Sequence, residues 1–89
     1  CAVIMEVERN IRPNISFLKS IRKFCTQNKI VLIFDECSSG FREVLGGIHK
    51  KYKVYPDMAM FSKSIGNGYP ITVLAGKSEF LNESFNSTC

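Results

Sequence analysis

Two short, uninterrupted apolar runs, AVIM at residues 2–5 and IVLIF at residues 30–34, limit what this 89-residue chain can fold into. Runs of this kind, rich in β-branched residues, are typical of strands that are covered on both faces, and such strands occur mainly in parallel sheets. Between the runs, apolar residues recur at helical spacing, which predicts a helix over about residues 15–28. The strand–helix–strand order therefore predicts a βαβ unit.

The remaining elements are predicted from shorter apolar runs and from turn residues. Asn14 is the expected N-cap of the long helix. Strands are expected at residues 57–61 and 71–75, and Ser78 is expected to begin a short helix over residues 78–84. One long helix cannot cover both faces of such a sheet. We therefore predict an α/β fold with a mainly parallel sheet and flanking helices, incomplete at both ends and belonging to a larger protein.

The charge and hydropathy of the chain argue against two kinds of partner. Twelve basic and eight acidic residues give a formal net charge of +4 at pH 7, and the basic residues are spread over the sequence. Nucleic-acid-binding proteins usually show a denser basic stripe with interleaved aromatic residues, so no nucleic-acid partner is expected. No apolar run approaches the roughly 18 residues of a membrane span, so no membrane association is expected either.

The cysteines indicate a cellular compartment rather than a metal site. They stand at positions 1, 25, 37 and 89 without a C-x-x-C pair, and the single histidine, His49, is distant from all of them in sequence. This spacing argues against zinc. Cys25 falls on the apolar face of the predicted helix and Cys37 comes just after a predicted strand, so both are expected to be buried free thiols. Such thiols fit a reducing compartment, and a cytoplasmic protein is expected.

Asp35 and Lys63 are the two residues from which chemistry is predicted. Asp35 follows IVLIF, so its carboxylate is expected at the carboxyl end of a buried parallel strand, where open α/β sheets bind ligands. An acid at this position also fits a simple turn. Lys63 lies between the apolar run MAMF and a turn containing Gly66 and Gly68, which allow the backbone to approach a ligand closely. A lysine beside apolar groups can lose its proton and attack an aldehyde.

A carboxylate at one strand end and a lysine at another suit the chemistry of pyridoxal 5′-phosphate (PLP). In such a site the lysine amine forms a Schiff base with the cofactor aldehyde. The carboxylate keeps the pyridine nitrogen protonated, so that the ring can accept electrons when a bond at the substrate α-carbon breaks. PLP is therefore the expected cofactor.

Residues 31–71, VLIFDECSSGFREVLGGIHKKYKVYPDMAMFSKSIGNGYPI, resemble the cofactor-binding segment of class-III aminotransferases, which are PLP enzymes of fold type I. The resemblance is carried by FDE, SGFR, LGG, the Pro-Asp pair and the K-x-x-G-x-G-x-P turn, all in the order of the family. It points to the glutamate-1-semialdehyde 2,1-aminomutase branch and to related aminotransferases of polysaccharide biosynthesis. It implies that residues 1–89 are a fragment of the large, cofactor-binding domain. It also implies that the longer protein moves an amino group, either between a small-molecule donor and acceptor or within one molecule.

The resemblance assigns roles to the residues that match the family motifs. Asp35 is implied as the partner of the pyridine nitrogen, and Lys63 as the residue that binds the cofactor covalently and moves protons. Cys37 stands where the family usually has valine or isoleucine packed against the cofactor ring, and cysteine is still apolar enough to do this. The Ser38 hydroxyl is expected to reach the phenolic oxygen of the cofactor, with a simple turn role as the alternative.

Two further residues are implied to lie near the cofactor. Glu6 matches the glutamate of a Glu-Pro pair in the family, although Val7 replaces the proline here. Thr88 matches a threonine that contacts the cofactor phosphate of the neighbouring subunit. The resemblance therefore implies a homodimer.

The other polar and aromatic residues are expected to have structural roles. His49 is expected on a surface helix after Gly47, and Arg42 is given no part in the reaction. Packing in the core is expected for five aromatic residues, Phe17, Phe24, Phe34, Phe41 and Tyr52. The alternative to an enzyme is a non-catalytic fragment or scaffold that keeps the fold, and the isolated fragment is expected to be inactive.

Overall fold

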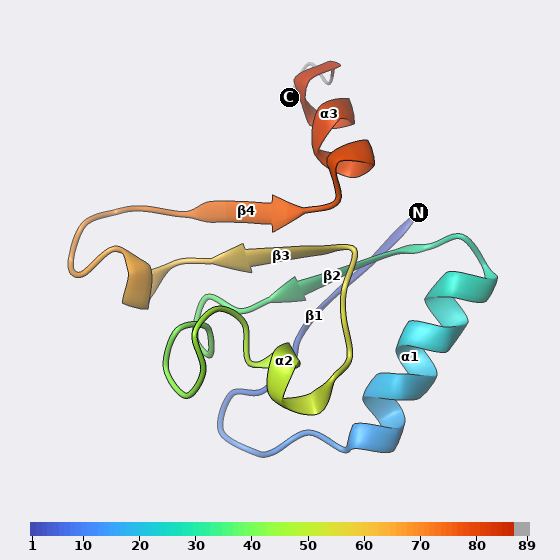
Figure 1. The fold of residues 1–89 in the computed structure, drawn as a ribbon, viewed down its shortest axis with the longest axis horizontal. Helices are drawn as coiled ribbons and strands as arrows, with labels where there is room; N and C mark the ends of the chain where they lie inside the picture. The colour runs from blue at the N-terminus through green and yellow to red at the C-terminus, as the bar shows by residue number, and fades with distance from the viewer. Residues whose placement is uncertain (87–89) are drawn as a thin grey trace.

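A four-stranded sheet in the order β1-β2-β3-β4 organises the computed structural model, which describes residues 1–86 (Figure 1). Its first three strands, β1 (Ala2–Glu6), β2 (Val31–Asp35) and β3 (Met58–Phe61), run parallel to one another. The last strand, β4 (Val73–Gly76), runs antiparallel to β3. The expected α/β fold with a mainly parallel sheet is confirmed.

The helices begin and end close to the predicted positions. The long helix α1 spans Ile15–Gln27, and the side chain of Asn14 accepts a hydrogen bond from Phe17 N at 3.2 Å, which confirms the predicted N-cap. The shorter helices are α2 (His49–Tyr52), the 3₁₀ turn η1 (Lys63–Ile65) and α3 (Ser78–Asn86). None of the helices in residues 1–86 is long and apolar enough to cross a bilayer.

The antiparallel direction of β4 follows from the short connection before it. A parallel neighbour requires a crossover that returns the chain to the other end of the sheet, usually through a helix. Residues 62–72 contain only the η1 turn and a glycine-containing bend, so the chain reverses and pairs Phe61 with Val73. The predicted strand at residues 71–75 is confirmed, shifted to residues 73–76.

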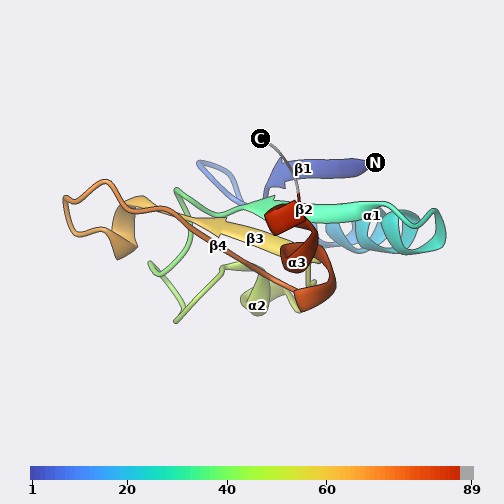
Figure 2. The ribbon, with the colours of Figure 1, turned by 90° about the horizontal axis from the view of Figure 1, so that it is seen from above.

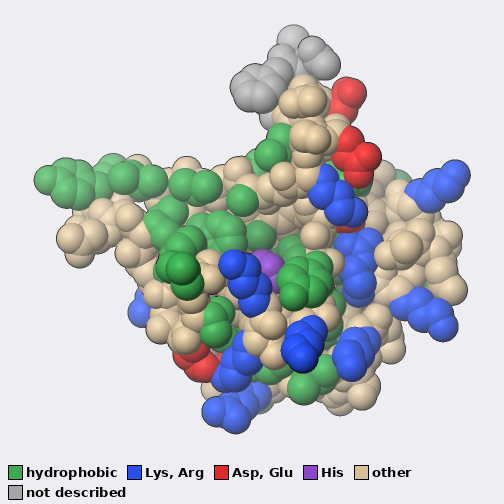
Figure 3. Space-filling view, in the orientation of Figure 1, with side chains coloured by type: hydrophobic (Ala, Val, Ile, Leu, Met, Phe, Trp, Pro, Cys, Tyr) green, Lys and Arg blue, Asp and Glu red, His purple; other side chains and the backbone are tan. Residues whose placement is uncertain are grey.

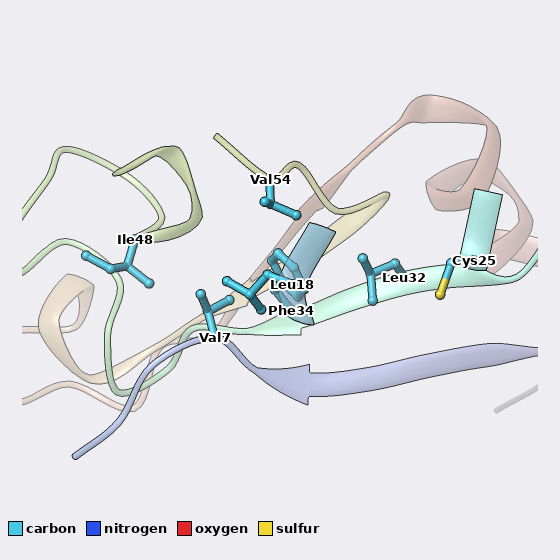
Figure 4. Close-up of a cluster of buried hydrophobic side chains, with 7 residues drawn as sticks. All are labelled: Val7, Leu18, Cys25, Leu32, Phe34, Ile48 and Val54. Atoms are coloured by element: carbon cyan, nitrogen blue, oxygen red, sulfur yellow. The ribbon is translucent and has the colours of Figure 1, made fainter. Parts of the chain in front are cut away.

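The hydrophobic core lies on one side of the sheet, where α1 and α2 both pack (Figures 1 and 2). Leu32 and Phe34 of β2 point to this side and are fully buried. Leu18 and Cys25 of α1 meet them, so the expected burial of Cys25 is confirmed. The cluster drawn in Figure 4 consists of Val7, Leu18, Cys25, Leu32, Phe34, Ile48 and Val54.

The opposite face of the sheet is open in residues 1–86, as expected if one long helix cannot cover both faces of the sheet. Ile4 of β1 is 59% exposed, and β2 alternates between buried and half-buried residues. Strand alternation and the register place Ile4, Ile33, Glu6, Asp35 and Met60 on this face. The physical reason is that α1 and α2 both lie on the other side.

The aromatic residues are distributed differently from the prediction. Phe34 is buried in the core, and Tyr52 is half-buried and packs against it. Phe17 and Phe24 are about half exposed, so their expected core role is wrong for residues 1–86. Phe41 is 43% exposed but packs edge-to-face on Phe61, with the ring centroids 5.4 Å apart. On α1 the buried positions are taken by Leu18 and Cys25 instead.

Candidate functional site

Three residues predicted to act in catalysis or cofactor binding stand at one edge of the sheet. Glu6 and Asp35 are the last residues of β1 and β2, and they are direct partners in the parallel register. Met60 of β3 is the next partner of Asp35, and Lys63 follows only three residues later. Because parallel strands end at the same edge, the fold brings Glu6, Asp35 and Lys63 together although 28 residues or more separate each from the next in sequence.

The amine of Lys63 points toward the loop that follows Asp35. Its Nζ donates a hydrogen bond to the Ser38 hydroxyl oxygen at 2.7 Å, and the lysine is exposed. Lys63 has a φ of +46°, a left-handed backbone conformation that is uncommon for residues other than glycine. The following turn needs its glycines, since a Cβ at Gly66 would collide with the carbonyl oxygen of Tyr69 and Gly68 has a φ of +95°. The backbone thus turns sharply where the amine is presented.

The carboxylate of Asp35 is fixed by the turn that follows it. Its Oδ1 accepts a hydrogen bond from the backbone N–H of Cys37 at 3.0 Å, and the residue is half-buried. This is the geometry of an Asx turn, so the expected alternative of a turn role is also realised. The same hydrogen bond holds the carboxylate at the strand end, where a ligand can reach it.

Cys37 lies within the electrostatic influence of the neighbouring charged groups. Partial burial raises the pKa of its thiol, and the hydrogen bond with Asp35 and the negative charge of Asp35 raise it further. The positive charge of Lys63 acts in the opposite direction, and the charge of Glu6 adds a smaller increase. The thiol is therefore protonated at neutral pH and behaves as a small apolar group.

Glu6 has a second charged neighbour besides Asp35. Its carboxylate lies 3.6 Å from a guanidinium nitrogen of Arg9, and the side chains of Glu6 and Arg9 are 40% and 65% exposed. An ion pair this exposed contributes little to stability. Glu6 therefore remains accessible at the strand end, next to Asp35. Thr88, the residue expected to reach a neighbouring subunit, lies outside the described residues.

The position of His49 differs from the prediction. It is only 8% exposed, and its ring nitrogen Nδ1 lies 2.5 Å from a carboxylate oxygen of Glu36, which is fully buried. Its neighbours Lys50 and Lys51 are exposed, as expected for a helix at the surface. Lysine and arginine side chains gather on the face over α1 and α2 (Figure 3). The expected surface helix is thus correct for the lysines and wrong for the histidine.

Glu36 and Arg42 are contacts of the site that sequence reasoning missed. Arg42 Nε donates to the Ser38 carbonyl at 2.6 Å, which fixes the loop that carries Ser38. Glu36 holds the same loop from the buried side. The sequence did contain a signal for Glu36. Because side chains alternate along a strand, an acid directly after Asp35 is expected to point to the opposite face, into the core. No local sequence pattern predicts that its partner is His49, thirteen positions later.

Comparison with known proteins identifies the family. Residues 1–87 match the sequence profile of the class-III aminotransferases. The chain belongs to this family. It is 43% identical over 84 residues to glutamate-1-semialdehyde 2,1-aminomutase of Geotalea daltonii, and 46% identical over 84 residues to the enzyme of the same name from Methanococcoides burtonii. These matches cover 91% and 90% of this chain but only 20% of either relative, so the chain spans about a fifth of their length.

Solved structures support the same fold. An omega-transaminase from Sphaerobacter thermophilus matches with a TM-score of 0.82 and 30% identity, over 90% of this chain and 19% of that one. The PLP internal aldimine form of the FumI protein from Sphingopyxis sp. MTA144 matches with a TM-score of 0.88 and 23% identity, over 99% of this chain and 23% of that one. The second likeness concerns the fold alone. The family resemblance seen in the sequence is confirmed.

Proposed function

We propose that this class-III aminotransferase chain supplies the PLP-binding part of an enzyme that transfers an amino group. The observation that carries the proposal is the contact between the Lys63 amine and the loop after Asp35, at the carboxyl ends of the parallel strands. Lys63 Nζ lies 2.7 Å from the hydroxyl of Ser38, three residues after Asp35. Asp35 and Lys63 stand at the same end of the sheet, and a carboxylate and an amine placed there fit the pyridine nitrogen and the aldehyde of PLP.

Each residue at this edge has a role in the proposal. Lys63 would hold the cofactor covalently through its amine, and the same amine, once displaced by the substrate amine, would move the proton at the substrate α-carbon. Asp35 holds a proton on the pyridine nitrogen, with its carboxylate oriented by the N–H of Cys37. When bound, PLP supplies an electron sink for the bond that breaks. Cys37 packs its protonated thiol against one face of the ring. The Ser38 hydroxyl donates a hydrogen bond to the phenolic oxygen once the Lys63 amine is no longer bonded to that hydroxyl.

The proposal extends to the longer protein that contains this chain. Residues 1–89 form part of a large, cofactor-binding domain, since the matched relatives are about five times as long. The enzyme works in the cytoplasm as a homodimer in which Thr88 contacts the cofactor phosphate of the neighbouring subunit, and Glu6 lies beside the cofactor. Its substrates are small amines and carbonyl compounds. Two forms of the reaction are open. The similarity to aminomutases supports transfer of the amino group within one molecule, and the similarity to the transaminase supports transfer between two molecules.

Borohydride trapping of the cofactor tests the assignment of Lys63. Reduction of the full-length protein with bound PLP should fix a pyridoxyl group on the peptide that contains Lys63, as read by mass spectrometry. Lys63→Ala should hold PLP only non-covalently, and exchange of the substrate α-proton should nearly stop, because the amine that lies beside Ser38 has been removed.

Other lysines of the chain serve as controls. Lys51 and Lys77 are already paired with Glu43 and Asp57, and Lys50 donates to the carbonyl of Leu45. A pyridoxyl group on one of these lysines in the wild-type protein would show that the active site has been assigned wrongly. Five of the remaining lysines serve as control positions: Lys19, Lys50, Lys51, Lys53 and Lys77.

A further inference from the structure

Glu36 is a fully buried acid next to the proposed catalytic aspartate. Its backbone N–H donates to the carbonyl of Met60 at 2.9 Å, which extends the pairing between β2 and β3 by one residue. Because side chains alternate along a strand, Asp35 faces the open side of the sheet and Glu36 faces the side of α2. The two acids therefore have different surroundings, and Glu36 is closed off from the space in front of Lys63.

The carboxylate of Glu36 receives hydrogen bonds from the start of α2 and from its own loop. Oε2 accepts from Ile48 N at 2.5 Å, and Oε1 accepts from His49 N at 3.2 Å. His49 Nδ1 lies 2.5 Å from Oε1, and because this oxygen already accepts from the backbone N–H of His49, we assign the ring nitrogen as the donor. The Ser39 hydroxyl donates to Oε2 at 3.4 Å. These contacts tie the end of β2 to the beginning of α2.

Two glycines show that the loop is built closely around Glu36. A Cβ at Gly47 would lie 2.6 Å from Glu36 Oε1 and would collide with the ring of His49. A Cβ at Gly40 would lie 2.8 Å from the carbonyl oxygen of Glu36 and 2.6 Å from Phe61 Cδ1. That same carbonyl accepts from Gly40 N at 2.8 Å. Both ends of the loop therefore pack against Glu36 without room for a side chain.

The segment held in this way carries the proposed cofactor contacts. Cys37 N donates to Asp35 Oδ1, and the hydroxyl of Ser38 receives the amine of Lys63. We infer that Glu36 and His49 form a buried clip that positions the Asp35–Ser38 segment for the cofactor, with His49 as a positioning residue. The role of the clip in cofactor binding rests on the proposed function. The existence of the clip rests only on the contacts of Glu36.

The clip predicts a graded response to substitution at His49. His49→Leu removes the side-chain donor and leaves Oε1 of Glu36 with the backbone N–H alone. His49→Gln keeps a side-chain donor at this position. Since a buried polar group that loses a hydrogen-bond partner costs free energy, loss of this bond should raise the population of the open loop about tenfold.

The experiment measures loop opening and cofactor binding separately in the full-length protein. Amide hydrogen exchange of the cofactor-free protein reports on peptides from residues 36–48, and the dissociation constant of PLP is measured by fluorescence. In His49→Leu, exchange of the amides of Cys37 and Ile48 should rise about tenfold, and PLP should bind about tenfold more weakly. His49→Gln should restore both quantities to near the wild-type values.

A matched core variant separates positioning from general loss of stability. Leu32 is fully buried on the part of the cluster away from Ile48 (Figure 4), so Leu32→Ala should lower thermal stability without changing loop exchange or PLP affinity. The inference is overturned if His49→Leu leaves both readouts unchanged, or if His49→Gln is as impaired as His49→Leu. A wild-type protein that takes up no PLP would instead overturn the proposed function, while the exchange data would still decide whether the clip exists.

Discussion

Asp57 offers the sharpest quantitative test of what holds this fold together. Its side chain is 6% exposed and lies 2.8 Å from Arg22 of α1 and 2.6 Å from Lys77, which precedes α3. The backbone N–H of Leu32 in β2 also donates to it at 2.9 Å. One carboxylate thus joins α1, β2 and the end of β4. We predict that Asp57→Asn destabilises the protein and leaves PLP attachment at Lys63 unchanged.

The size of the effect follows from the pKa of Asp57. Burial alone would raise this pKa, but the hydrogen bonds from Leu32 N, Lys77 and Arg22 outweigh it and lower the pKa from 3.8 to about 2. At about 1.4 kcal/mol per unit, the ionised carboxylate contributes on the order of 2 kcal/mol to the free energy of unfolding at neutral pH. Lys77 is 58% exposed, so its share is small and most of the charge contribution comes from Arg22.

The pH dependence has a defined sign. Because the folded-state pKa is lowered, the stabilisation is complete above the unfolded-state pKa of 3.8 and is lost as the pH falls toward about 2. Urea unfolding of the full-length wild type and of Asp57→Asn should therefore differ by about 2 kcal/mol at pH 7, and the difference should shrink below pH 4. Asp57→Ala also removes the partner of Leu32 N–H, which should cost about 1–3 kcal/mol more.

Two results would refute this reasoning. One is a difference between wild type and Asp57→Asn of less than about 0.5 kcal/mol at pH 7, the level expected for ordinary surface substitutions. The other is a difference that stays constant on acidification, which would mean that the carboxylate charge is not the cause. Hydrogen exchange at the amide of Leu32 locates the effect, because it should become faster in Asp57→Ala than in Asp57→Asn.

Three further predictions concern the proposed active site, the core and the assembly. Asp35→Asn should lower turnover by orders of magnitude without unfolding the protein, because the pyridine nitrogen loses its charged partner; turnover near that of the wild type would leave Asp35 with only its turn role. Phe34→Ala should cost about 3–5 kcal/mol in urea unfolding, whereas Phe24→Ala, on a side chain that is 53% exposed, should cost far less; equal losses would contradict the core described above. Light scattering should find the full-length protein to be a dimer, and a fully active monomer would remove the proposed role of Thr88.

Local sequence patterns were sufficient for most of the helices and strands and for the positions of two proposed site residues. The apolar runs before Asp35 and Lys63 predicted β2 and β3, and Asn14 predicted the start of α1, because strand and helix formation depend on side chains that are near in sequence. The ends of parallel strands share an edge whatever the loops do. Asp35 and Lys63 could therefore be placed at the same end of the sheet from the sequence alone.

Tertiary structure decided which side chains are enclosed and what they meet. Two lysines follow His49 in sequence, yet it is buried, because the loop after Gly40 folds back and places it on Glu36. The helical positions of Phe17 and Phe24 leave them about half exposed, because α1 turns Leu18 and Cys25 toward β2. Burial and pairing across long sequence separations depend on how elements pack, since a buried acid must find its donors wherever the fold brings them. Local periodicity carries no information about which donors will lie beside a buried acid.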